Sequence, residues 1–180
     1  IQLPFLEVTD FLLLRNDSQI LISNPEESTL DLYSLETKKL IQSYPIQNPA
    51  SRLCKLPGDA RALMGSPDGT VSLFSLLDFS IIWSISLTAE SKVFAAAVTP
   101  DGSICIVRDN FAITLLSSED GSTFLRIITE GTNATESLCI SQDGTILASP
   151  VNQSIYFWSL PDGKLIGCPF DLSEMKPSQK

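Results

Sequence analysis

An aspartate recurs at a constant interval along this chain of 180 residues. It occupies positions Asp17, Asp59, Asp101 and Asp143, so that successive occurrences lie 42 residues apart. A second marker, a large apolar residue followed by serine, recurs at intervals of 41, 42 and 42 residues, at Tyr33-Ser34, Phe74-Ser75, Leu116-Ser117 and Trp158-Ser159. Four units in register predict a repeat architecture, in which each unit buries its apolar faces against its neighbours.

The third unit indicates what each repeat contains. Residues 92–128 hold four short apolar runs, separated by turn signals at residues 99–102, 109–111 and 119–122. This pattern predicts a four-stranded antiparallel meander. The run 103–107 is nearly continuously apolar, which is typical of strands that are buried on both faces.

A period of about 40–45 residues with four strands per unit is typical of the blades of a β-propeller. We therefore predict an all-β chain that forms four blades of four antiparallel strands, either as a closed ring or as an incomplete arc of a larger propeller. The expected blades are residues 11–50, 51–91, 92–133 and 134–170, preceded by a lead-in or a strand of a preceding blade (1–10) and followed by a loose tail (171–180). Phe74 and Trp158 hold equivalent places in their units, and we expect both to be buried between sheets.

The composition argues against several functions. The chain has 12 lysines and arginines against 21 aspartates and glutamates, a net charge of −9, which disfavours nucleic acids and anionic membrane surfaces as partners. It contains no histidine, and this excludes Ser-His-Asp and Cys-His catalysis and histidine metal sites. We interpret the paired carboxylates Glu26-Glu27 and Glu119-Asp120 as solvated turn charges. We therefore expect neither enzymatic activity nor a cofactor nor a metal.

The cysteines bear on the compartment. Cys54, Cys105, Cys139 and Cys168 each fall in a predicted strand, and no two form a CxxC pair. They indicate buried free thiols in a reducing, cytoplasmic compartment. The alternative is a secreted or lumenal four-blade binding domain of hemopexin-like shape, with a disulfide and with glycans at the sequons of Asn16, Asn133 and Asn152.

The chain resembles the WD-repeat family over residues 11–170, and four motifs carry the resemblance. They are Thr99-Pro100-Asp101-Gly102, Ser141-Gln142-Asp143-Gly144, Asp68-Gly69-Thr70-Val71 and Trp158-Ser159. The chain departs from the family pattern in lacking its Gly-His pair and in carrying serine where the Trp-Asp pair has aspartate. The resemblance implies a rigid, non-catalytic scaffold for protein partners. Degenerate arrays of this kind occur in NACHT and WD-repeat signalling proteins. In such a protein, further blades of the same parent chain would pack beside these four.

Propeller topology places the turns between second and third strands on one side, together with the links between blades. We expect the following residues there: Glu26, Glu27, Asp68, Glu90, Lys92, Arg108, Asp109 and Glu130. This side is interpreted either as a solubilising acidic surface or as a binding face for a basic or polar segment of another protein.

Overall fold

The structure is a computed structural model that describes residues 8–14, 17–88, 91–129 and 137–172. These residues form strands and no helix, and hence no helix long and apolar enough to span a membrane occurs among them. The first sheet consists of β1 (Phe11–Leu14), β2 (Gln19–Asn24), β3 (Thr29–Ser34) and β4 (Leu40–Pro45), and the second of β5 (Arg52–Lys55), β6 (Arg61–Gly65), β7 (Thr70–Ser75) and β8 (Ile81–Ser86). The third consists of β9 (Ala95–Val98), β10 (Ile104–Arg108), β11 (Ala112–Ser117) and β12 (Thr123–Ile128), and the fourth of β13 (Cys139–Ile140), β14 (Ile146–Val151), β15 (Ser154–Ser159) and β16 (Phe170–Asp171).

Each sheet is an antiparallel meander in which neighbours in sequence are neighbours in space. This confirms the all-β prediction of four four-stranded sheets. The sequence pattern predicts the last strand of the fourth sheet near residues 164–169. There Leu165 forms only an isolated bridge to Trp158, and the strand lies at Phe170 and Asp171. Asp171 therefore belongs to the sheet rather than to a tail.

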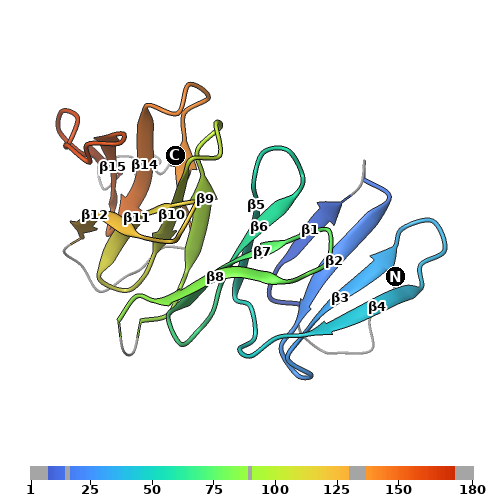
Figure 1. Ribbon diagram of the computed structural model, residues 1–180. Coiled ribbons are helices and arrows are strands. Elements are labelled where there is room, and N and C mark those ends of the chain that lie inside the picture. The colour runs from blue at the N-terminus through green and yellow to red at the C-terminus, as the bar shows by residue number, and fades with distance from the viewer. Residues whose placement is uncertain (1–7, 15–16, 89–90, 130–136, 173–180) are drawn as a thin grey trace, which may run out of the picture.

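The four sheets stand side by side in chain order, as consecutive blades of a propeller do (Figure 1). Their inner strands contact one another in the order β1, β5, β9 and β13. The first and fourth sheets lie at opposite ends of this row (Figure 1). In the described residues the arrangement is thus propeller-like and open.

Apolar side chains pack in each of the three spaces between sheets. Phe74 is 1% exposed and packs with Leu30 of the first sheet, whereas Trp158 is 5% exposed and packs with Leu115 of the third. The predicted burial of both aromatic residues is confirmed. Two-sided burial explains the continuously apolar strands, because each inner sheet packs against a neighbour on either face.

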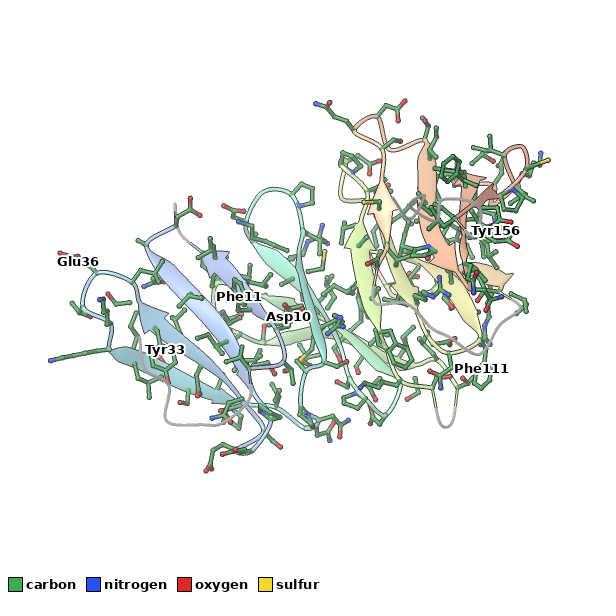
Figure 2. The ribbon with its side chains drawn as sticks, turned by 180° about the vertical axis from the view of Figure 1, so that it is seen from behind. Asp10, Phe11, Tyr33, Glu36, Phe111 and Tyr156 are labelled. Atoms are coloured by element: carbon green, nitrogen blue, oxygen red, sulfur yellow. The ribbon has the colours of Figure 1, made fainter. Side chains whose placement is uncertain are left out.

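Hydrogen bonds also join adjacent sheets. The carboxylate of Asp10 accepts the backbone N–H of Leu53 at 2.8 Å, at the place where the first and second sheets meet (Figure 2). Between the second and third sheets, Arg52 Nε donates to the carbonyl oxygen of Phe94 at 2.5 Å. These bonds set the position of one sheet against the next, which apolar contacts alone specify weakly.

The recurring aspartate has two different structural roles. Asp101 accepts hydrogen bonds from the Thr99 hydroxyl at 2.6 Å and from the Ser103 backbone N–H at 3.1 Å, and these bonds lower its pKa to about 2. Asp143 makes the corresponding bonds in the fourth unit. Both aspartates thus form an Asx-type turn.

The other two aspartates occupy a left-handed backbone position instead. Asp17 and Asp59 have φ of 61° and 56°, and in the third and fourth units that place is taken by Gly102 and Gly144, both at 75°. Aspartate tolerates this conformation better than most residues. The constant interval of 42 residues therefore hides a shift of one position between the second and third units.

The serine that ends each third strand stabilises the next turn. The Ser75 hydroxyl accepts the N–H of Leu77 at 3.2 Å, and the Ser117 hydroxyl accepts that of Glu119 at 3.2 Å. A short side chain that accepts a bond two residues ahead closes such a turn locally. The Ser34 hydroxyl accepts the N–H of Thr37 at 3.1 Å, and the Ser159 hydroxyl donates to the carbonyl oxygen of Lys164 at 3.4 Å, so this serine bonds to its turn in every unit.

The four cysteines carry free thiols, but they are not all buried strand residues. Cys54 and Cys105 lie between the second and third sheets, whereas Cys139 is exposed on β13. Cys168 is exposed and lies outside any strand, so its predicted placement is wrong. Of the sequon asparagines, Asn152 is exposed in a turn, and Asn16 and Asn133 lie outside the described residues.

Candidate functional site

Four of the eight predicted binding residues are exposed at one end of the sheets. Glu26 and Glu27 lie on the β2–β3 turn, and Asp68 lies on the equivalent β6–β7 turn. Lys92 is exposed on the link that follows β8, with its Nζ 5.4 Å from the centre of the Phe94 ring. Glu90 and Glu130 lie outside the described residues.

The second unit brings its turn and its link together. The carbonyl oxygen of Ser66 accepts the N–H of Val93 at 3.3 Å, and that of Gly69 accepts the N–H of Leu87 at 3.1 Å. Asp68 and Lys92 therefore belong to the same side of the molecule. This is the arrangement that propeller topology leads one to expect.

Arg108 and Asp109 are buried, and this corrects their expected place on an exposed face. Arg108 ends β10, and its Nη1 donates to the hydroxyl of Ser149 and to the carbonyl oxygen of Pro150, at 2.8 Å from the latter. Burial lowers the pKa of the Arg108 guanidinium, while the charge of Asp109 acts against that shift. Arg108 thus links the third sheet to the fourth as the last residue of β10, and the turn begins at Asp109, as the sequence indicates.

Asp109 closes its own turn from the interior. Its Oδ1 accepts the N–H groups of Phe111 and Ala112, each at 2.7 Å, and its Oδ2 lies 3.4 Å from Nη2 of Arg126. With no exposed surface of its own, this carboxylate contributes to the turn rather than to a binding face.

A hollow of about 360 Å³ lies between the first and second sheets. Its aromatic wall consists of Tyr44, Phe74 and Phe79, and the rings of Tyr44 and Phe79 stack with their centres 3.7 Å apart. Gln47 and Asn48 add amide groups from the link that follows β4. All the described residues that line the hollow have uncharged side chains.

Three serines form the polar part of this hollow. The hydroxyls of Ser72 on β7 and Ser84 on β8 are hydrogen bonded to each other at 2.8 Å. Ser66, at the end of β6, is fully buried, and its Oγ has no hydrogen-bond partner among the described residues. A buried hydroxyl without a partner is uncommon in native proteins and calls for an explanation.

The third sheet fills the equivalent positions with larger, paired side chains. Ser66 and Asp109 are equivalent, because each precedes the turn after the second strand of its sheet. The N–H of Ser66 donates to the carbonyl oxygen of Thr70, and the N–H of Asp109 donates to that of Ala112. Ser72 pairs with Ser84 in register as Thr114 pairs with Arg126. Where the third sheet has the Asp109–Arg126 contact, the second has serines and a hollow.

The sequence prediction missed this hollow. Its signal is present once the units are aligned by strand, because Ser66, Ser72 and Ser84 fall together where a neighbouring unit carries an aspartate and an arginine. Small side chains at three adjacent positions indicate missing volume.

The described residues contain no group of three or more Cys, Asp or Glu side chains that could hold a metal ion. Comparison of the chain with models of known protein families gave no match, and comparison with curated proteins gave none.

Proposed function

We propose that the four sheets are blades of a WD-repeat-like β-propeller that acts as a non-catalytic scaffold for protein partners. The observation that carries this proposal is the construction of the sheets. They pack face to face through apolar cores and are linked by hydrogen bonds such as Asp10 to Leu53, while the turns at their ends stay exposed. Loops held on a rigid stack of sheets are a common basis for protein binding.

We further propose that the row is an arc of a larger propeller. Leu12 and Leu14 face the second sheet, so the alternating residues Phe11 and Leu13 face outward. Phe11 is 53% exposed, and at the other end of the row Phe170 of β16 is 49% exposed. Further blades would cover both end faces, as neighbouring sheets cover the inner ones.

Sedimentation velocity at tens of micromolar tests the arc. Exposed apolar end faces favour self-association, so the wild-type chain should form dimers or larger species. The variant Phe11→Lys/Phe170→Lys should shift the distribution toward monomer. A compact wild-type monomer would contradict the open arc and favour a closed ring of four blades.

Two charge-reversal variants, one at the turn face and one as a control, test protein binding there. A fluorescent lysine-rich peptide should bind the wild-type chain at low salt and lose affinity in Glu26→Lys/Glu27→Lys/Asp68→Lys. The matched control, Glu36→Lys/Glu119→Lys/Asp162→Lys, makes the same change in net charge at exposed residues of the opposite turns, with Glu36 at the outer edge of the first sheet (Figure 2). Equal loss in both variants would contradict a specific binding face.

A further inference from the structure

We infer that the hollow between the first and second sheets receives a tyrosine or tryptophan side chain of a protein partner. The inference rests on the proposed protein-binding function and adds to it the chemistry of one contact. It assigns the hollow to an uncharged aromatic group that carries one hydrogen-bonding atom.

Charge excludes acidic and basic side chains as occupants. The lining residues that the structure describes contribute hydroxyl, amide, thioether and hydrocarbon groups, and none carries a charge. A charged group that enters such a site loses its hydration without gaining a partner, which is strongly unfavourable. The occupant is therefore neutral.

Ser66 contributes an unpaired hydroxyl group. Its hydroxyl is buried, lines the hollow and finds no acceptor or donor within the described part of the chain. Ser72 and Ser84 bond to each other and retain unused acceptor capacity. A phenol O–H or an indole N–H that enters the hollow would donate to the oxygens of this pair, and the packing would have to open slightly for it to reach Ser66.

The volume of the hollow and its aromatic wall suit an aromatic side chain. A volume of about 360 Å³ is at the low end of the range of roughly 300–1,000 Å³ for ligand sites. The stacked pair Tyr44 and Phe79 offers an aromatic surface at the wall, and Phe74 lies beyond it. Tyrosine and tryptophan combine a large apolar body with one polar atom, and they are over-represented among residues that dominate protein interfaces.

The units carry different residues at the positions that line this hollow. In the third sheet the equivalent positions hold Asp109 and Arg126, which contact each other at 3.4 Å. Within the first sheet, Asn24 donates to Asp31 at 3.2 Å in the corresponding region. The second sheet has only serines there, so both the space and the unpaired hydroxyl arise from the same substitutions in the repeat.

Capped amino acids provide a direct test. N-acetyl-L-tyrosinamide and N-acetyl-L-tryptophanamide are titrated into the ¹⁵N-labelled chain, and amide chemical shifts are followed. We expect saturable shifts centred on Ser66, Ser72 and Phe79. N-acetyl-L-phenylalaninamide, which lacks the polar atom, should bind at least fivefold more weakly, and the capped aspartate should not bind. Equal affinity for the tyrosine and phenylalanine probes, or no saturable shift at these residues, would overturn the inference.

A free phenol separates a protein side chain from a small molecule. Gln47 and Asn48 line the hollow with amide groups that can bond the backbone of an entering peptide. N-acetyl-L-tyrosinamide should therefore bind at least threefold more tightly than p-cresol. Equal affinities would assign the hollow to small phenols and overturn the inference of a partner side chain.

Two variants localise the effect. Ser66→Asp/Ser84→Arg reproduces the pair of the third sheet and should abolish binding of the tyrosine probe, while Ser66→Ala should keep the fold and reduce the preference for tyrosine over phenylalanine. Thermal melting and circular dichroism verify that each variant is folded. Unchanged probe binding in folded Ser66→Asp/Ser84→Arg would place the contact elsewhere.

The same variants distinguish this inference from the proposed function. Binding of the lysine-rich peptide to the turn face should be unaffected by Ser66→Ala, because Asp68 and Glu26 remain in place. Loss of probe binding with retained peptide binding supports the hollow as a distinct contact. If the wild-type chain binds the peptide but not the probe, only the inference about the hollow is contradicted. If it binds the probe but not the peptide, only the proposed binding at the acidic turn face is contradicted.

Discussion

The hydroxyl of Ser51 donates a hydrogen bond to the carbonyl oxygen of Val93, 2.9 Å away, across the boundary between the second and third sheets. The two residues are 42 positions apart, and by strand register the equivalent of Ser51 in the next unit is Phe94, the residue that follows Val93. The same hydroxyl lies 3.0 Å from the carbonyl oxygen of Gly65 within its own sheet. One buried side chain thereby connects two repeats.

Two serine-to-alanine substitutions should have different effects on stability. Ser51→Ala removes a buried donor from two carbonyl oxygens and should lower the free energy of unfolding by about 1–3 kcal/mol. Ser66→Ala removes a hydroxyl that has no described partner, so it should be neutral or stabilising. Urea denaturation measures both, and an equal loss would show that Ser66 is hydrogen bonded in solution.

Truncation of the two buried aromatic residues should be strongly destabilising. Phe74→Ala and Trp158→Ala each leave a cavity between neighbouring sheets, and each should cost about 3–5 kcal/mol in equilibrium unfolding. Phe124→Ala is the matched control, because Phe124 is 47% exposed on β12, and its cost should stay within about 0.5 kcal/mol. Similar losses for Phe74 and Phe124 would mean that the interface around Phe74 is loosely packed.

Alanine substitutions at two glycines should distinguish the energetic cost of backbone strain from that of a steric clash. Gly58 has φ of 87° with open space around it, so Gly58→Ala should cost only the left-handed conformation, about 1–2 kcal/mol. Gly121 has φ of 74°, and a Cβ added there would lie 2.7 Å from Cε3 of Trp83. Gly121→Ala should therefore cost more and change the Trp83 fluorescence. Equal melting temperatures for the two variants would contradict close packing at Trp83.

The two thiols between the second and third sheets should make stability fall in alkaline solution. Burial, together with the charge of Asp10, raises the pKa of Cys54 to about 11, and burial with the nearby Cys54 raises the pKa of Cys105 to about 12. The folded chain keeps protons that the unfolded chain releases, so this contribution is fully present below the unfolded pKa near 9.0 and declines as the pH rises above it. Unfolding free energies from pH 7 to 10 should decrease less in Cys54→Ala/Cys105→Ala than in the wild type.

The control for this pH dependence removes the exposed thiols instead. Cys139→Ala/Cys168→Ala retains both thiols between the sheets and should reproduce the wild-type slope between pH 7 and 10. Tyr33, whose pKa burial also raises, is present in every variant and cancels in the comparison. Identical slopes in the two double variants would assign the alkaline loss to other groups.

Much of the fold could be read from residues that act within one unit. The Asp101 turn and the serine caps at Ser75 and Ser117 depend on hydrogen bonds between neighbours in sequence. A constant period and continuous apolar runs then predict four equivalent sheets. Even here the shift between Asp59 and Asp101 went unseen, because a shift of one position gives the recurring aspartate a different backbone conformation without changing its residue type.

The candidate site was less predictable, because burial depends on what the neighbouring sheet supplies. The sequence pattern predicts Arg108 on the exposed turn face, yet its side chain crosses to Pro150 of the fourth sheet. The hollow at Ser66 exists only because the first sheet places Tyr44 opposite three small side chains.

The sequence by itself determined the number of sheets, the order of their strands and the chemistry of most turns, since these depend on residues a few positions apart. Only the tertiary structure decided which polar groups are buried, which are paired and where space remains. Those properties arise between units about 42 residues apart, and contacts at that separation depend on how two complete sheets pack rather than on any local pattern.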